Sequence, residues 1–352
     1  MAELSVDGLK GDDGKMSIKT SACTIKDVAK LAGVSVGTTS KVINGQYVRP
    51  ESREKVERAI AELGYVPNSL ARSLKKSSTK TIGVMIPDIS SSINGKVLRG
   101  IGDSCKELGY AVMYTDFRQS EEAELEIFHM FQEKMVDGIL YASNHPSEAF
   151  LEAVHESQIP TVLIMTTVPD QSLPAITIDN EAAAYEMTKY LIENGHREIL
   201  MLAGGLYDRN AGIPRTGGYM RALMEAGIPV RSELIRYGTY DFDRGYQDTN
   251  EALKKGAPFT AVFAASDLIA IGAMKALTEH GFQIPRDVSI AGFDGISVAG
   301  YMTPALSTIQ QPFAEFGEEG IRMLVRMIEE GYTGKDKRLK WKLIKTGSIR
   351  HI

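Results

Sequence analysis

The residue types that perform catalysis occur in this chain without the spacings that catalysis needs. Gly100 and Gly102 begin a dinucleotide-binding pattern, but Cys105 stands where its third glycine should be. Residues 295–299 contain the serine of a nucleophile elbow and lack the closing glycine. The six histidines form no pair with the spacing of metal ligands. No motif therefore indicates an enzyme or a metal site, and we expect no cofactor.

A second set of residues suits the recognition of a polyanion. From Lys15 to Lys80 the chain carries 13 Lys and Arg against five Asp and Glu, although the formal net charge of all 352 residues is −5. The rest of the chain is therefore acidic. A small basic module joined to a large acidic body indicates a nucleic acid-binding head on a domain with another task. On charge alone, a helical module with a solvated basic face is the alternative.

Three short helices are predicted in the basic module. Their expected ranges are 25–32, 36–43 and 50–63, with Thr24 and Ser35 as N-caps and Gly33 and Gly64 as stops. The expected apolar faces are Ile25, Val28, Leu31 and Ala32 in the first helix and Val56, Ala59, Ile60 and Leu63 in the third. The first two helices and the glycine turn between them have the form of a helix-turn-helix. This turn and its serine cap favour DNA binding over a generic three-helix domain.

The segments around this module are expected to be irregular. Residues 1–22 are predicted to be a disordered leader, since residues 1–15 are polar and rich in Gly and Asp. Residues 68–74 are compatible with a helix, but seven residues are too few for a stable isolated helix in water. No apolar run approaches the roughly 18–20 residues that span a bilayer. The two cysteines, Cys23 and Cys105, form no CxxC pair, which favours a reducing cytoplasm.

From Thr81 onward, short apolar runs alternate with amphipathic segments. Eight ranges are predicted to be strands: 81–86, 111–115, 138–141, 161–165, 175–178, 199–203, 261–265 and 288–293. Helices are expected between most of them, for example at 93–108, 122–134, 182–194, 217–226 and 267–280. Unbroken apolar strands with helices between them are typical of parallel sheets covered on both faces. About ten strands suit two open sheets, with a final strand at 339–344.

Residues 24–44 resemble the DNA-binding head of the lactose-repressor (LacI/GalR) family. The resemblance continues at 53–56, 63–68 and 71–74, and in the body at 82–84, 136–139, 195–196, 218–219, 258–261 and 292–294. It covers nearly the whole chain from about residue 23. It implies an α-helical helix-turn-helix head and a hinge helix, joined to an α/β body of two doubly wound subdomains like those of periplasmic binding proteins.

The resemblance implies that the second helix enters the major groove of operator DNA. The residues at the main specificity positions are Val36, Gly37 and Lys41, and those suited to phosphates or neighbouring base edges are Ser35, Thr38, Ser40 and Asn44. Lys41 stands where many members carry Arg, and Gly37 has no side chain that can contact a base. We therefore expect an operator specificity that differs from that of better-studied relatives.

The resemblance also implies a DNA-binding role for the hinge, whose matching residues are Tyr65, Asn68, Ala71 and Leu74. In the family, the hinge segment folds upon docking, and the leucine that matches Leu74 inserts into the minor groove beside its twin. Packing of Leu70 and Leu74 on the body is the alternative.

The family's body binds a small effector between its subdomains, at the carboxyl ends of strands. By motif match, Arg215 is the arginine that grips the effector, while Asp267 and Asp294 follow strands and Tyr240 could stack on a sugar face. Asp267 is equally suited to cap the helix that follows it.

One stretch departs from the family pattern. Members often carry an Asn-Pro-aromatic-aromatic run after the first strand, where this chain has Ser91, Ser92, Ile93 and Asn94. Ile93 and Asn94 are therefore expected in a pocket with less aromatic surface and an added amide, and a ligand other than a sugar stays open.

We predict a sequence-specific, homodimeric transcription regulator, a repressor whose affinity for a near-palindromic operator is set by a small effector, a sugar or a sugar phosphate. The expected divisions are residues 1–22, 23–66, 67–79 and 80–352, with body subdomains at 80–179 plus 311–338 and 180–310 plus 339–352. Control of the body by a protein partner stays open, as does a solute-binding protein without a role on DNA. A ligand-processing enzyme with the same layers would need a nucleophile or an acid/base pair in the cleft.

Overall fold

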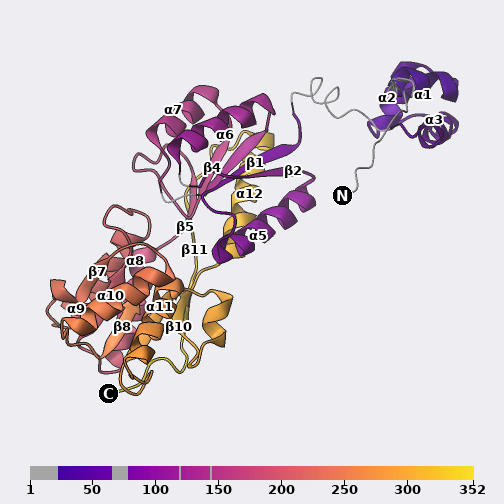
Figure 1. Cartoon of the computed structure of the whole chain (residues 1–352). Coiled ribbons are helices and arrows are strands. Elements are labelled where there is room, and N and C mark those ends of the chain that lie inside the picture. The colour runs from indigo at the N-terminus through magenta and orange to yellow at the C-terminus, as the bar shows by residue number, and fades with distance from the viewer. Residues whose placement is uncertain (1–22, 66–77, 119, 143–144) are drawn as a thin grey trace, which may run out of the picture. The chain divides into compact units, whose positions relative to one another are not determined.

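The computed structural model describes residues 23–65, 78–118, 120–142 and 145–352. The chain divides into two units, residues 1–77 and 78–352. The described part of the first unit contains the helices α1 (Ile25–Ala32), α2 (Val36–Ile43) and α3 (Pro50–Leu63) (Figure 1). The three predicted helix ranges are confirmed.

The ends of these helices are held by the expected residue types. Asp27 Oδ2 accepts hydrogen bonds from the backbone N and the Oγ1 of Thr24, at 2.8 and 2.7 Å. Ser35 Oγ accepts one from Thr38 N at 3.0 Å. Gly33 lies after α1 with φ +68°, a left-handed conformation that glycine adopts without a steric penalty. Local chemistry therefore determines where the helices begin and end.

The core of the first unit is small and consists of Val28, Ala32, Val42, Val56 and Ala59. The predicted face of α1 is wrong at one position, because Leu31 is 46% exposed and Ala29 is buried in its place. Successive helical residues are ~100° apart, so a face through residues 25, 28, 29 and 32 leaves residue 31 at its edge. Leu63 at the end of α3 is also exposed.

The described residues of the second unit form two six-stranded sheets (Figure 1). Sheet A has the order β11 (Lys337–Leu339), β5 (Ala175–Ile178), β4 (Thr161–Ile164), β3 (Gly138–Ala142), β1 (Thr81–Ile86) and β2 (Ala111–Asp116). Sheet B has the order β12 (Lys342–Ile344), β10 (Ser307–Gln310), β9 (Ser289–Asp294), β8 (Ala261–Ala264), β6 (Ile199–Ala203) and β7 (Ile235–Tyr237). Neighbouring strands are parallel, except that β12 runs antiparallel to β10. All eight predicted strands are present, each within one residue of its expected ends.

Helices cover both faces of the sheets. In chain order they are α5 (Ser92–Leu108), α6 (Glu121–Glu133), α7 (Glu148–Ser157), α8 (Asn180–Glu193), α9 (Gly212–Glu225), α10 (Phe242–Lys254), α11 (Asp267–Glu279) and α12 (Phe313–Glu330). Alternate residues of β1 enter different clusters: Val84 packs with Ile101 of α5, and Met85 packs with Phe128 of α6. This alternation is why central strands such as β6 and β8 are apolar at every position. Helix α9 begins five residues earlier than predicted, because Pro214 fits within its first turn.

The chain passes between the two sheets three times: between β5 and β6, between β10 and β11, and between β11 and β12. The predicted single strand at 339–344 is therefore wrong. Lys340 and Trp341 separate two short strands that belong to different sheets. No helix in the described ranges is both long and apolar enough to cross a membrane.

Candidate functional site

Helix α2 exposes one side of the first unit to solvent. Val36, Gly37 and Lys41 are exposed on it, whereas Thr39 and Val42 are buried against the other helices. The side that carries the predicted specificity residues is therefore accessible.

The polar residues at the ends of α2 also stabilise the helix. Ser35 Oγ lies 2.9 Å from Thr38 Oγ1, and Asn44 Nδ2 donates to the carbonyl oxygen of Ser40 at 2.8 Å. These residues remain wholly or partly exposed, so their side chains can also contact a polyanion.

Other predicted DNA contacts lie near or beyond the described part of the head. Tyr65 is half-buried against the core of the first unit. Asn68, Ala71 and Leu74 lie outside the described residues. Tyr47, two positions after the Asn44–Gly45 turn, is 88% exposed and was not singled out from the sequence.

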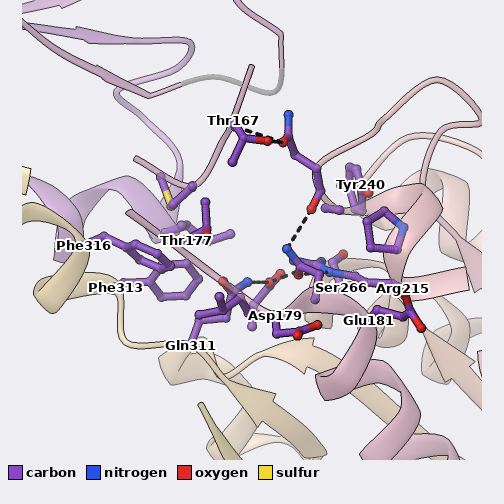
Figure 2. Close-up of a pocket in the computed structure, with 18 of the residues that line it drawn as sticks. Thr167, Thr177, Asp179, Glu181, Arg215, Tyr240, Ser266, Gln311, Phe313 and Phe316 are labelled. Atoms are coloured by element: carbon purple, nitrogen blue, oxygen red, sulfur yellow. Dashed lines mark hydrogen bonds and ion pairs between the residues drawn. The ribbon is translucent and has the colours of Figure 1, made fainter. Parts of the chain in front are cut away.

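The second unit holds a cavity of about 440 Å³ between its sheets (Figure 2). Residues that follow the carboxyl ends of strands contribute to its wall, among them Met165 after β4, Asp179 after β5 and Ser266 after β8. Because β4, β5 and β8 run parallel to their neighbours in each sheet, these ends converge on one crevice.

Arg215 of α9 is the central cation of this cavity. Its Nε donates to Asn180 Oδ1 at 2.9 Å and its Nη1 to the carbonyl oxygen of Ala265 at 2.6 Å. The guanidinium carbon lies 3.8 Å from the centre of the Phe293 ring. The guanidinium group is therefore held in one orientation before any ligand arrives.

Asp294, the last residue of β9, faces Arg215. Its Oδ1 lies 3.6 Å from Arg215 Nη1 and accepts a hydrogen bond from Gln311 Nε2 at 2.7 Å. Burial raises the pKa of this carboxyl group, and Arg215 opposes that rise. The backbone of Asp294 has φ +118°, an unusual conformation for a residue with a side chain and one that the surrounding contacts must maintain.

Asp208 organises the loop that leads into α9. Its Oδ2 accepts hydrogen bonds from Tyr240 Oη at 2.6 Å and from Gly212 N at 3.0 Å. The pKa of Tyr240 is raised mainly because the side chain is buried, so its hydroxyl stays protonated. The ring of Tyr240 is thus fixed at the cavity wall.

The same loop bridges the two halves of the cavity (Figure 2). Asn210 Oδ1 accepts hydrogen bonds from the N and Oγ1 of Thr167, each at 3.0 Å, and its Nδ2 donates to Thr166 Oγ1 at 2.8 Å. Asn180 Nδ2 donates to the carbonyl oxygen of Asn210 at 2.8 Å. The segment after β4 of sheet A is therefore connected to the loop before α9.

The structure brings four of the six predicted effector residues to the cavity wall: Ile93, Arg215, Tyr240 and Asp294. Asn94 is not part of the described wall, because its Nδ2 donates to the carbonyl oxygen of Asp88.

Asp267 is also absent from the described wall. It is fully buried, and its two oxygens accept hydrogen bonds from Thr308 Oγ1 and Ile296 N, at 2.6 and 2.8 Å. It is not the helix cap either, since Ser266 Oγ accepts from Ile269 N. The helix cap lies one residue earlier than predicted, which turns Asp267 toward sheet B.

Sequence reasoning missed the aromatic part of the wall. Phe313 and Phe316 of α12 line the cavity, so the predicted shortage of aromatic surface is compensated from another segment (Figure 2). Gln311, Asn180 and Thr167 were also missed. Each of these residues follows the end of a strand, Thr167 after β4, Asn180 after β5 and Gln311 after β10. Their position just after a predicted strand was the only signal in the sequence.

Comparison with known proteins agrees with this arrangement. Residues 79–345 match the family model described as periplasmic binding proteins and sugar binding domain of LacI family. Residues 24–68 match the model for bacterial regulatory proteins, lacI family. The chain belongs to the LacI family. It is a DNA-binding transcriptional regulator with a sugar-binding type of effector domain. The family resemblance and the fold class predicted from the sequence are confirmed.

The relatives of this LacI-family chain are similar over most of their length. The HTH-type transcriptional regulator RegA of Clostridium saccharobutylicum is 37% identical over 310 residues, which cover 88% of this chain and 93% of that protein. A transcriptional regulator CelR–cellobiose complex is 32% identical with a TM-score of 0.72, and covers 93% of this chain and 99% of its own. The lac repressor dimer bound to operator and the anti-inducer ONPF is 27% identical with a TM-score of 0.85, at the same coverage. LacI-family regulators bind operator DNA and small-molecule effectors and act as dimers.

Proposed function

We propose that this chain is a homodimeric repressor whose affinity for a near-palindromic operator is set by a sugar or sugar phosphate bound between sheets A and B. The preorganised Arg215 guanidinium group in the cavity carries the proposal. Its Nε and Nη1 are held by Asn180 and Ala265, and Asp294 lies beside it. Adjacent sugar hydroxyls suit such a combination of fixed donors and a carboxylate.

The shape and chemistry of the wall support a sugar ligand. Phe313 and Phe316 offer apolar rings for the C–H face of a sugar, and Gln311 adds an amide. A cavity of about 440 Å³ lies within the size range of small-molecule sites. The similar regulator CelR forms a complex with cellobiose, which is a sugar.

On DNA, the proposal assigns base contacts to Val36, Gly37 and Lys41, and phosphate or neighbouring contacts to Ser35, Thr38, Ser40 and Asn44. Exposure of α2 supports this assignment. Tyr65, Asn68, Ala71 and Leu74 are proposed as hinge contacts, and residues 23–66, 67–79 and 80–352 as the working divisions of the chain. The symmetry of a dimer matches that of a palindromic operator.

The proposal also includes a cytoplasmic location and a binding rather than a catalytic role. Polar groups around the cavity, such as those of Tyr240 and Asn210, are held in place by hydrogen bonds. Fixed polar groups of this kind favour the binding of a ligand. Loss of turnover of a bound compound on replacement of Asp294 and Arg215 would instead indicate an enzyme.

The proposal is tested by a thermal-shift screen against sugars, sugar phosphates and purines, because a ligand that binds the folded body raises its melting temperature. A sugar or sugar phosphate is expected to stabilise the wild type and to have no effect on Arg215→Lys, which keeps the charge and loses the planar fork. A screen in which only purines stabilise the wild type would contradict the ligand class. Stabilisation that persists unchanged in Arg215→Lys would contradict the site.

A further inference from the structure

Each acidic side chain in the described wall of the cavity has a cationic partner. Asp179 Oδ2 accepts a hydrogen bond from Arg338 Nη1 at 2.9 Å. Glu181 Oε1 accepts one from Arg221 Nη1 at 2.6 Å. The third acidic group is the carboxylate beside Arg215. The negative charges of the described wall are therefore balanced by arginines that are already bound to them.

Arg209 is the remaining charged residue of the described wall. Its side chain is exposed, and among the described residues it has no partner in a hydrogen bond, an ion pair or a ring contact. Because the other arginines balance the acidic groups of the wall, Arg209 adds a positive charge that no described neighbour compensates. A cleft with an uncompensated positive charge attracts anions.

The residues on either side of Arg209 fix the position of its backbone. Asp208 Oδ1 accepts hydrogen bonds from Asn210 N and Ala211 N, at 3.1 and 3.0 Å. Asn210 Oδ1 in turn accepts from Thr167 N, on the segment after β4. The backbone of Arg209 is thus held at the cavity, while its guanidinium group is not bound to any described residue. A fixed backbone lowers the entropy that is lost when this side chain binds a ligand.

The other parts of the wall suit a neutral sugar ring. Phe313 and Phe316 lie on one side of the cavity and Arg215 and Tyr240 on the other (Figure 2). The aromatic rings suit the C–H face of a sugar, and the fixed polar groups beside Arg215 suit its hydroxyls. Arg209 adds a different capacity, because a guanidinium group forms paired, charge-assisted hydrogen bonds with phosphate or carboxylate.

We infer that Arg209 is a specificity-determining residue that binds an anionic group of the ligand, so that the cavity selects a sugar with a phosphate or carboxylate group over the same sugar without one. This inference rests on the proposed function and narrows its ligand class. The contacts around Arg215 are available to both forms of the sugar. The contact with Arg209 is made only by the anionic form, and specificity is the difference between the two affinities.

The test compares matched ligands on the full-length protein. The probes are glucose, fructose and ribose, each with its monophosphate, and glucuronate, which carries a carboxylate instead. Thermal shifts identify the probes that bind, and calorimetric titration at one salt concentration gives their Kd. Binding of a monophosphate but not of glucuronate identifies the anionic group as a phosphate, and the reverse result identifies it as a carboxylate.

Two variants of Arg209 and one control are compared with the wild type. Arg209→Gln removes the charge and keeps a polar side chain, whereas Arg209→Lys keeps the charge and loses the planar fork. Arg197→Gln is the matched control, because Arg197 is also exposed and has no partner among the described residues. It lies just before β6, at the opposite end of the strands of sheet B from the cavity.

The wild type and Arg197→Gln are expected to bind an anionic probe about tenfold or more tightly than the neutral sugar that matches it. In Arg209→Gln the Kd of the anionic probe should rise about tenfold, toward that of the neutral sugar, and Arg209→Lys should lie between. Melting temperatures without ligand should be unchanged, since Arg209 is exposed.

Equal affinity of the wild type for the neutral and the anionic form would overturn the inference. So would an anionic probe that binds Arg209→Gln as tightly as it binds Arg197→Gln. Failure of the proposed function gives a different result: no sugar or sugar phosphate stabilises the wild type, or stabilisation persists unchanged in Arg215→Lys.

Discussion

Arg215 Nη1 lies 3.6 Å from Asp294 Oδ1, and both side chains are almost completely buried. Arg215 extends from α9 and Asp294 ends β9, so the pair connects two elements of the same half of the body at the cavity wall. Each charge makes burial of the other tolerable. The pair is therefore both a structural requirement and the polar centre of the proposed site.

Removal of Arg215 should lower the stability of the body and abolish the ligand response without abolishing DNA binding. Arg215→Ala leaves Asp294 buried without its counter-charge, which is expected to cost about 3–5 kcal/mol of unfolding free energy. The ligand response should disappear, while operator binding persists at temperatures below the melting transition. Chemical denaturation and operator titration measure the two effects. Arg221→Ala is the control: its ion pair with Glu181 is partly exposed, so a much smaller loss is expected, and an equal loss would contradict this account.

The two buried carboxyl groups should make the body less stable as the pH rises. Burial raises the pKa of Asp267 and of Asp294, and Asp294 raises that of Asp267 further. At these two positions the native state then holds more protons than the unfolded state, so their contribution to the free energy of unfolding falls as the pH rises from about 4, the ordinary carboxyl pKa, toward neutrality. Asp267→Asn should flatten this dependence in melts recorded across that range. Asp103→Asn, which changes an exposed carboxylate of α5, should leave the slope as it is. The same slope in Asp267→Asn as in the wild type would contradict the prediction.

Two glycines of α5 should respond oppositely to the same substitution. A Cβ on Gly100 would lie 2.1 Å from the carbonyl oxygen of Ala314 in α12, so Gly100→Ala is expected to destabilise the body by about 1–3 kcal/mol. A Cβ on Gly102 would approach only Tyr114 Oη, at 3.4 Å. Gly102→Ala should therefore be neutral or stabilise by up to about 1 kcal/mol through helix propensity. Equal stabilities in denaturant titrations would show that α5 and α12 are not closely packed.

The role of Lys41 on DNA can be measured directly. Lys41→Ala is expected to weaken operator binding by about 1–3 kcal/mol, because an exposed cation of α2 would lose its contact with a base or phosphate. Lys55→Ala serves as comparison, since Lys55 lies on α3 and pairs with Glu51. Fluorescence anisotropy at one fixed salt concentration gives both affinities. Wild-type affinity in Lys41→Ala would contradict the assignment of α2 to the major groove.

Elements that depend on local chemistry could be predicted from the sequence. Ser35 and Gly64 mark helix ends by hydrogen bonding and left-handed conformation, and both act where expected. Buried strands such as β6 are apolar at every position, which few other structures require. Arg215 and Asp294 were identified by resemblance, because a motif keeps its place relative to the strands.

The remaining features depend on contacts between distant segments. Phe313 and Phe316 reach the cavity only because the chain crosses back to sheet A after β10. Leu31 lies at the edge of a face whose centre is set by the packing of α2 and α3. Asp267 differs from its predicted role by a shift of one residue in the helix cap. No local pattern distinguishes these outcomes from their alternatives.

The central claim is that a ligand in the cavity controls binding to DNA. The most direct measurement is the operator Kd at fixed salt concentration, with and without the sugar or sugar phosphate that most stabilises the body in a thermal-shift screen. Our account predicts a change of about fivefold or more in Kd, which disappears in Arg215→Ala. The same Kd with and without a ligand that demonstrably occupies the cavity would contradict it.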